Sequence, residues 1–263
     1  MCYYNGQKVT HQEFIRLMKL EKDITSLDFL DKGVINGFTN VPIAVLIPNA
    51  DKTNFDIVQM EWGMIAPFIP NRQEAEIFKR KFTTLNAKSE NLFLNEAGRK
   101  SMWADAAKKR RCLILSTGFF EWRHIYRNHA KTGLPLKTPD KYPYYINVKD
   151  APYFYFAGIY QSWTDRETGE HVNTVAVITT KANQLMAQVH NSKVRMPTIL
   201  NDDLAWEWMM TDLTDERIME IAATQYPADK MDVCTISPQF QALLDPTEPY
   251  DYGAELPALE VAL

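Results

Sequence analysis

The sequence predicts a single α+β domain built around a mostly antiparallel sheet. Strand-like runs rich in β-branched and aromatic residues outnumber the helical patterns. The two kinds of segment do not alternate regularly, as they would in a doubly wound parallel fold. A length of 263 residues, with 46% hydrophobic and 24% charged residues, suits a globular protein with a sizeable core.

The expected strands are short apolar runs bounded by Pro, Gly, Asn or Asp. They cover residues 43–47, 56–62, 112–116, 119–123, 144–148, 153–160 and 172–180. Helical patterns cover residues 11–22, 181–189, 202–210 and 214–223. The first helix is predicted because Thr10 and Glu13 form a capping-box pattern ahead of Phe14. Asp202 or Asp203, and Thr214, are suitable N-caps for the last two.

Two segments have the composition of exposed chain. Residues 124–143 are basic and contain three prolines and a glycine, which predicts a long loop. From Asp232 to the end there are six acidic residues and no basic one. We therefore expect one domain over residues 1–240 and an acidic, weakly structured tail over residues 241–263.

Charge is distributed unevenly along the chain. The net charge is −4, but residues 72–137 contain 15 Lys and Arg against 6 Asp and Glu, a surplus of nine. Such a segment can form a cationic face for nucleic acid on an acidic protein. An ordinary solvated surface explains the same count.

Cysteine usage and hydropathy exclude several classes of protein. The three cysteines (Cys2, Cys112 and Cys234) are widely spaced and form no CxxC motif, which argues against a disulfide framework or a structural zinc site. The first residues contain no apolar signal segment, and no run approaches the 18 or so apolar residues of a membrane span. We expect a monomeric, cytoplasmic protein without metal or organic cofactor.

Cys2 is the most informative single residue, because it follows the initiator methionine. Removal of Met1 would leave an α-amine and a thiol on adjacent carbons. An amine of this kind condenses with an aldehyde to an imine, and the thiol then closes a five-membered thiazolidine. Both groups titrate near neutral pH in water, at about 7.7–8.0 and 8.5. The alternative is an accidental cysteine at a frayed terminus.

Three further residues are candidates for chemistry, each with a structural alternative. Glu121 lies within the aromatic run FFEWR and either transfers protons from a partly desolvated site or pairs with Arg123 at the surface. His190 is either a general acid or base or a helix C-terminal histidine. Asn86 either holds a backbone group or ends a strand in a turn.

These stretches together resemble the SRAP family (SOS-response-associated peptidase). The resemblance rests on the Met-Cys start, residues 86–90 (NAKSE), residues 118–122 (GFFEW) and the histidine and RMP between 190 and 197, in the family's order. It covers residues 1 to about 240. Two positions depart from the family pattern: Tyr3-Tyr4-Asn5 replaces the common Gly-Arg-Phe, and Lys88 replaces an arginine, which loses bidentate phosphate geometry.

The resemblance implies a bifurcated, barrel-like β-sheet surrounded by helices and a role for each motif. Cys2 would be the nucleophile that traps the aldehyde of an abasic site in single-stranded DNA. Asn86 would hold the terminal residue, Glu121 would move protons, and His190 would help to open the deoxyribose. DNA contacts are expected from four further side chains: Lys88, Trp62, Arg123 and Arg195.

The sequence therefore predicts a sensor of abasic sites that forms a covalent DNA–protein crosslink, with associated lyase and self-processing peptidase activities. Its expected partners are single-stranded DNA containing abasic sites and replication-fork components, and the protein would be associated with the nucleoid when bound to DNA. Two alternatives remain. One is a thiol peptidase or amidohydrolase that uses Cys2, which needs an oxyanion hole. The other is a non-catalytic single-stranded DNA-binding module.

Overall fold

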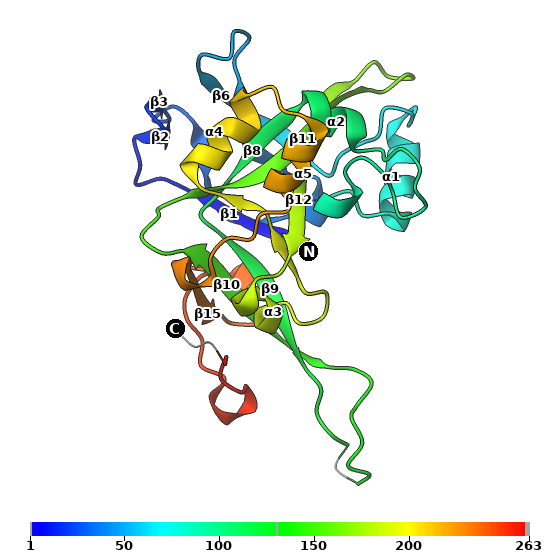
Figure 1. Ribbon diagram of the computed structural model, residues 1–263. Helices are drawn as coiled ribbons and strands as arrows, with labels where there is room; N and C mark the ends of the chain where they lie inside the picture. Colours follow the sequence, from blue (N-terminus) through cyan, green and yellow to red (C-terminus); the bar gives the residue numbers. More distant parts are fainter. Residues whose placement is uncertain (1, 130, 261–263) are drawn as a thin grey trace.

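The computed structural model describes residues 2–129 and 131–260, and most of its strands belong to two sheets (Figure 1). The smaller sheet has five strands in the order β15-β10-β9-β1-β4. Their bounds are Met231–Thr235 (β15), Asp140–Val148 (β10), Gly118–Ile125 (β9), Tyr4–Lys8 (β1) and Asp31–Asn36 (β4). All four pairings in this sheet are antiparallel.

The larger sheet has eight strands and closes on itself. Its main path is β13-β12-β6-β5-β8-β11-β14, and β12 also pairs with β11, so the strands between them form a barrel. The bounds are Pro42–Pro48 (β5), Phe55–Trp62 (β6), Arg111–Ser116 (β8), Phe154–Thr164 (β11), His171–Lys181 (β12), Arg195–Pro197 (β13) and Ile199–Leu200 (β14). The short strand β7 (Asn86–Lys88) pairs in parallel with β12.

Five α-helices surround the sheets (Figure 1). Their bounds are Arg72–Lys81 (α1), Ala104–Lys109 (α2), Gln184–Val189 (α3), Asp202–Met210 (α4) and Asp215–Ala222 (α5). Asparagine or threonine side chains cap α1, α3, α4 and α5 at their N-termini, and each accepts a backbone N–H of the first turn. None of the helices in the described part of the chain is long and apolar enough to cross a membrane.

The predicted fold class and every predicted strand are confirmed, and one predicted helix is wrong. Residues 11–22 do not form a helix but contain a hairpin of β2 (Phe14–Leu17) and β3 (Leu20–Asp23), with Met18 at φ 55° in the turn. Ile15 and Leu17 are both fully buried, which is the two-residue period of a strand. The hydroxyl of Tyr155 donates to the Arg16 carbonyl oxygen. Packing on β11 therefore overrides the local capping signal.

Sequence patterns also missed short elements and the extent of one hairpin. Helices α1 and α2 were not predicted. Strands β9 and β10 extend into the predicted loop at 124–143, and the chain between them projects as an arm from the body of the molecule (Figure 1). We call residues 126–139 the β9–β10 arm.

The segment after Pro238 contacts the smaller sheet. Phe240 is buried and stacks on Phe120 with ring centroids 4.9 Å apart. The hydroxyl of Tyr252 donates to the carbonyl oxygen of Ile236. Leu256 and Leu259 pack against the core that contains Cys2. This acidic segment therefore lies along strands β10 and β15.

A candidate active site around Cys2

Strand β1 positions Cys2 at the centre of the molecule. Because β1 lies between β4 and β9, the chain that enters it is enclosed on both sides, and Cys2 is 0% exposed. The Tyr3 carbonyl oxygen accepts the backbone N–H of Gly37 at 2.9 Å. The Cys2 carbonyl oxygen accepts the side-chain Nδ2 of Asn86, also at 2.9 Å. The N-terminal end of the chain is thus held by hydrogen bonds from two different segments.

Asn86 reaches Cys2 because β7 pairs with the barrel strand β12, with Asn86 opposite Val177. The side chain is buried, and its amide crosses from the larger sheet to the residue that precedes β1. Its carbonyl oxygen Oδ1 is also buried and has no hydrogen-bond partner among the described residues. A buried acceptor of this kind is costly unless a donor reaches it. Asn86 Oδ1 is therefore a buried acceptor with the capacity for one further N–H donor.

Glu121 lies on β9 on the face that is directed toward Cys2. Side chains alternate along this strand: Phe119 packs in the core with Cys2, and Phe120 packs with Phe240 on the other face. Glu121 is only 3% exposed, and burial raises the pKa of its carboxyl to about 7. It is therefore not a surface glutamate, and it exchanges protons near neutral pH.

Gly118 explains why the GFFEW stretch begins with glycine. A Cβ at this position would lie 2.2 Å from the ring of Tyr145, so any side chain would displace the ring. The Tyr145 hydroxyl donates to the Thr117 carbonyl oxygen at 2.6 Å and fixes that ring over the start of β9. Glycine at this position thus allows Tyr145 to pack over the start of β9, the strand that carries Glu121.

His190 is the C-cap of α3, and its ring is buried. The Nδ1 atom lies 2.8 Å from the Arg195 carbonyl oxygen, which can only accept, so Nδ1 carries the proton and Nε2 does not. Nε2 lies 3.7 Å from Oε2 of Glu121. Burial lowers the pKa of the imidazole to about 4, so the ring is neutral at pH 7.

Asn191, which sequence patterns did not single out, fixes His190 relative to Glu121. Its Oδ1 accepts the backbone N–H of His124 at 2.9 Å, and its Nδ2 donates to the His124 carbonyl oxygen at 2.8 Å. This pair of bonds ties the loop after α3 to β9, three residues beyond Glu121. An asparagine next to a candidate histidine was the available signal, but its partner is 67 residues away in sequence.

The thiol of Cys2 is protonated at neutral pH in this setting. Burial raises its pKa well above the usual value, and the nearby Glu121 carboxylate raises it further. The thiol donates weakly to the Tyr4 carbonyl oxygen at 3.6 Å. A buried thiol needs a neighbouring base to become a nucleophile, and Glu121 is suited to take its proton.

Among the four predicted DNA contacts, Trp62 requires correction. The side chain is 0% exposed, and its indole N–H donates to the Leu85 carbonyl oxygen at 3.0 Å. A ring enclosed in this way offers no free face for base stacking, because the folded barrel covers it. The tryptophan instead supports the segment that leads into Asn86.

The three predicted cationic contacts have different surroundings. Arg195 is 8% exposed, and its guanidinium forms a bidentate ion pair with Glu90 at 2.7 and 3.0 Å. This ion pair therefore links the NAKSE stretch (residues 86–90) to the RMP stretch (residues 195–197), and the guanidinium does not face solvent. Arg123 is half-buried and donates to the Pro257 carbonyl oxygen. Lys88 is partly exposed and pairs with Glu96 at 2.8 Å.

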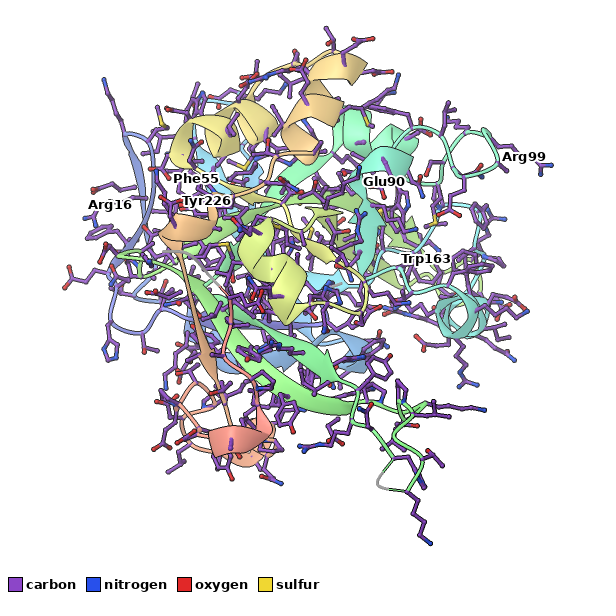
Figure 2. All side chains as sticks on the ribbon, turned by 60° about the horizontal axis from the view of Figure 1, so that its bottom comes forward. Arg16, Phe55, Glu90, Arg99, Trp163 and Tyr226 are labelled. Carbon is purple, nitrogen blue, oxygen red and sulfur yellow. The ribbon has the colours of Figure 1, made fainter. Side chains whose placement is uncertain are left out.

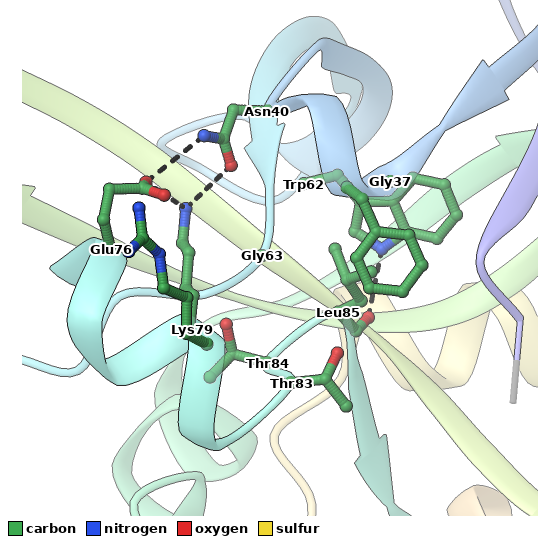
Figure 3. A pocket seen from close by; sticks show the side chains of 11 residues that line it. Gly37, Asn40, Trp62, Gly63, Glu76, Lys79, Thr83, Thr84 and Leu85 are labelled. Carbon is green, nitrogen blue, oxygen red and sulfur yellow. Dashed lines mark hydrogen bonds and ion pairs between the residues drawn. The ribbon is translucent and has the colours of Figure 1, made fainter.

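A small cavity lies beside this site (Figure 3). Gly37, whose N–H bonds to Tyr3, and Leu85, which precedes Asn86, both line it.

No group of three or more His, Cys, Asp and Glu side chains in residues 2–129 and 131–260 is arranged to hold a metal ion.

The fold and this site define an α+β domain in which a buried cysteine at position 2 lies near a carboxyl group whose pKa is raised to about 7 and a neutral imidazole. The model of the family "SOS response associated peptidase (SRAP)" matches residues 1–242. The chain belongs to this family, as the four motifs predicted.

Relatives and solved structures agree with this assignment. "Abasic site processing protein YoqW" of Bacillus subtilis is 30% identical over 211 residues, which cover 80% of this chain and 83% of YoqW. "Abasic site processing protein HMCES" of Gallus gallus is 25% identical over 61% of this chain and 47% of its own length. A crystal structure of a protein from Bacteroides thetaiotaomicron has a TM-score of 0.70 at 27% identity, covering 94% of this chain and 97% of that one.

Proposed function

We propose that this protein processes abasic sites in single-stranded DNA by forming a covalent thiazolidine crosslink through Cys2 after removal of Met1. The observation that carries the proposal is the enclosure of Cys2 between Asn86, which binds its carbonyl oxygen, and Glu121, whose pKa is raised to about 7 by burial. The relatives YoqW and HMCES are named abasic site processing proteins, which supports the same substrate.

The reaction proceeds in two condensation steps at one residue. The α-amine of Cys2 adds to the ring-opened aldehyde of the abasic sugar, and the carbinolamine loses water to give an imine. The thiol then adds to the imine carbon, and its proton passes to the former imine nitrogen, so the adduct is the sum of both reactants minus one water. Amine and thiol on one residue avoid the entropic cost of a second encounter, which is worth up to about 7–11 kcal/mol in well-oriented cases.

Glu121 and His190 divide the proton transfers between them. Glu121, half-protonated near pH 7, protonates the leaving hydroxyl of the carbinolamine and takes the thiol proton in the second step. The unprotonated Nε2 of His190 lies 3.7 Å from Glu121 and accepts a proton from it or from the opening sugar. The buried Oδ1 of Asn86 accepts an N–H of the terminal amine and orients its lone pair.

The imine also supports strand cleavage, because it acidifies the adjacent carbon and allows β-elimination of the 3′ phosphate. Capture by the thiol competes with this elimination. The crosslink is therefore the main product when the thiol is present, and lyase activity is the side reaction.

Intact-mass measurement after incubation with an abasic oligonucleotide tests the proposal. We expect the protein to lack Met1 and to gain the oligonucleotide mass minus one water. Incubation with peptides gives the comparison, since a thiol peptidase would cleave them and form no DNA adduct. Full retention of Met1 in a crosslinked preparation would contradict the proposal. A module that only binds single strands would bind the DNA without any mass increase.

A further inference from the structure

The end of the chain passes from one face of the smaller sheet to the other (red in Figure 1). Phe240 packs on the face away from the candidate active site. Pro249 then forms a bridge with Ile236, just after the edge strand β15. Beyond this bridge the ring of Tyr252 contacts that of Tyr142, with centroids 4.8 Å apart. Tyr142 belongs to the core on the inner face, so the segment wraps around the edge of the sheet toward the site.

Residues 251–260, which we call the C-terminal strap, bind to β9 beside the candidate active site. Arg123 lies on the same face of this strand as Glu121, because the two residues are two positions apart. Its guanidinium donates to the carbonyl oxygen of Pro257. The strap therefore occupies a cation that the sequence predicts as a DNA contact.

The strap also binds α3, the helix whose C-cap is the candidate histidine. The backbone N–H of Glu260 donates to Oε1 of Gln188 on this helix at 2.6 Å. Leu256 and Leu259 pack against the hydrophobic core that contains Cys2. The strap thus extends from β9 to α3, the two elements that carry the residues proposed to transfer protons.

The candidate active site is closed in this structure, because Cys2, Glu121 and His190 are all buried. The sugar of a DNA strand reaches the cysteine only when part of this enclosure moves. Most of the surrounding elements are paired strands and helices. The strap has one short 3-10 turn (Gly253–Glu255) and, among the described residues, no strand pairing. A segment with so few internal bonds can open locally at low cost in free energy.

The charge of the strap and its place in the chain point to the same role. It contains three acidic residues, at positions 251, 255 and 260, and no basic residue. An acidic segment that lies on Arg123 competes with nucleic-acid phosphates for the same cation. The family model matches residues 1–242, so the strap lies outside the matched region.

We propose that the C-terminal strap is autoinhibitory: it holds the site closed and must leave β9 and α3 before Cys2 reacts with DNA at the full rate. The inference rests on the proposed function, because the step that the strap controls is the entry of the abasic sugar. DNA displaces the strap because a phosphate forms bidentate, charge-assisted bonds with Arg123, whereas the Pro257 carbonyl oxygen is a neutral acceptor. Only the open fraction of the protein binds the strand, which weakens the apparent affinity.

The first test detaches the strap in the full-length protein. Leu256→Ser combined with Leu259→Ser removes its two apolar contacts with the core. The rate of crosslinking to an abasic oligonucleotide is measured at subsaturating concentration. It should rise by about five- to thirtyfold, which corresponds to a closed form populated at about 80–97% in the wild type.

The matched control is Leu243→Ser combined with Leu244→Ser. Both leucines are exposed and lie in the same part of the chain, but outside the strap. Their replacement should leave the rate at the wild-type value. Gln188→Ala is a milder test that leaves the core intact, because it removes the hydrogen bond to Glu260. It should raise the rate by about two- to tenfold, the effect of one hydrogen bond.

A synthetic peptide of residues 248–260 tests whether the strap itself inhibits. Added at about millimolar concentration, the order of magnitude for a tethered segment, it should return the rate of the detached variant toward the wild-type value. The same peptide carrying Leu256→Ser and Leu259→Ser has an unchanged charge and should not inhibit. Inhibition by both peptides alike would mean that negative charge alone competes with DNA, and the strap would not be a specific inhibitor.

Affinity for an undamaged single strand is a second readout, which needs no chemistry at Cys2. It should also rise when the strap is detached. Arg123→Ala should lower this affinity more in the detached variant than in the wild type, because the strap occupies the guanidinium in the wild type. An equal effect of Arg123→Ala in both backgrounds would show that the strap does not compete for this residue.

Failure of this inference differs from failure of the proposed function. If detachment and Gln188→Ala leave both the rate and the affinity unchanged, the strap does not inhibit. If they lower the rate, the strap supports the site and the inference is wrong. If the detached variant binds undamaged strands more tightly but neither protein forms an adduct, the proposed function is wrong and the strap still controls access.

Discussion

Nε2 of His190 lies 3.7 Å from Oε2 of Glu121, and both side chains are almost completely buried. Burial acts on the two groups in opposite directions, because it favours the neutral form of each: the pKa of Glu121 rises to about 7 and that of His190 falls to about 4. At pH 7 the imidazole is thus neutral and the carboxyl is about half ionised, so Glu121 is the member of the pair that can both release and accept a proton there.

Cys2→Ala should abolish the stable adduct, because an imine without thiol capture hydrolyses. The terminal amine remains in this variant, so strand cleavage through the imine should persist and become the main product. Denaturing gels of both strands measure the two outcomes together. A heat-stable crosslink formed by Cys2→Ala would rule out the thiazolidine.

Glu121→Gln should slow crosslinking by about 10²–10⁴-fold, the usual contribution of a positioned acid or base. The amide preserves the shape of the side chain but transfers no proton, so binding of undamaged single strands should not change. The wild-type rate should vary with pH around 7, where Glu121 titrates, and the residual rate of the variant should lack that transition. Equal rates for the two proteins across pH 5–8 would return Glu121 to a structural role.

Stability should depend on pH through the same pair, with opposite signs. The folded pKa of Glu121 is about 7 against about 4.3 in an unfolded chain, so the unfolded state binds fewer protons between these values and stability falls as pH rises through them. Glu121→Gln should therefore gain stability relative to wild type at pH 8, by about 4 kcal/mol at most, and little at pH 4.

His190 acts in the acid range. Its folded pKa of about 4 lies below the unfolded value of about 6.5, so its contribution to stability is complete above pH 6.5 and is lost as pH falls toward 4. His190→Gln should flatten this acid limb. Urea unfolding at pH 5, 6.5 and 8 measures both effects. Identical pH profiles for wild type and both variants would show that the pair is not shifted by burial.

Asn86→Leu should lower the crosslinking rate more than it lowers binding of undamaged DNA. The substitution removes the hydrogen bond to the Cys2 carbonyl oxygen and the acceptor proposed for the terminal amine. Because leucine fills a similar volume in a buried position, the fold should persist with a loss of about 1–3 kcal/mol. Asn191→Ala is the comparison: it removes the bonds that tie the loop after His190 to β9, but the hydrogen bond from Asn86 to Cys2 remains. Unaltered crosslinking by Asn86→Leu would show that the amide only supports the strand.

Affinity for undamaged single strands should fall steeply with salt, and Lys88→Ala should lower that slope by about 0.7, the effect of one phosphate contact. The residue is partly exposed beside the site, although Glu96 competes for it. Lys131 and Lys137 are both exposed on the β9–β10 arm. Replacing them with neutral residues tests whether the arm also contacts the DNA strand. Lys19→Ala, in the β2–β3 turn far from the arm in Figure 1, is the control and should leave the slope unchanged.

If Lys19→Ala lowered the salt slope and the other lysine variants did not, the DNA would bind to another surface of the protein. The surplus of nine positive charges in residues 72–137 does not itself decide this point. Several of these side chains are used internally, such as Arg72, which pairs with Glu61 and Glu170. Figure 2 shows Arg99 at the edge of the molecule, away from Glu90. Salt slopes count only the charges that reach phosphate.

The sequence by itself predicted seven of the strands and the candidate residues of the site. The run 172–180 is rich in β-branched residues, and the run 112–116 is short and apolar, which are both patterns typical of strands. The alternation around Glu121 follows from the two-residue period of a strand, but the sequence left open whether the carboxylate is buried or pairs with Arg123 at the surface. Cys2, Asn86, Glu121 and His190 are the candidate residues that the sequence pattern and the family resemblance predict.

Only the tertiary structure decided what each polar or aromatic side chain meets. Local signals favoured a helix at 11–22, but burial of Ile15 and Leu17 against the barrel made a hairpin. Trp62 is enclosed and Arg195 is paired with Glu90, 105 residues away, so neither is free as sequence suggested. Burial and pairing depend on which distant segments pack together, and the desolvation that shifts Glu121 and His190 exists only once they have done so.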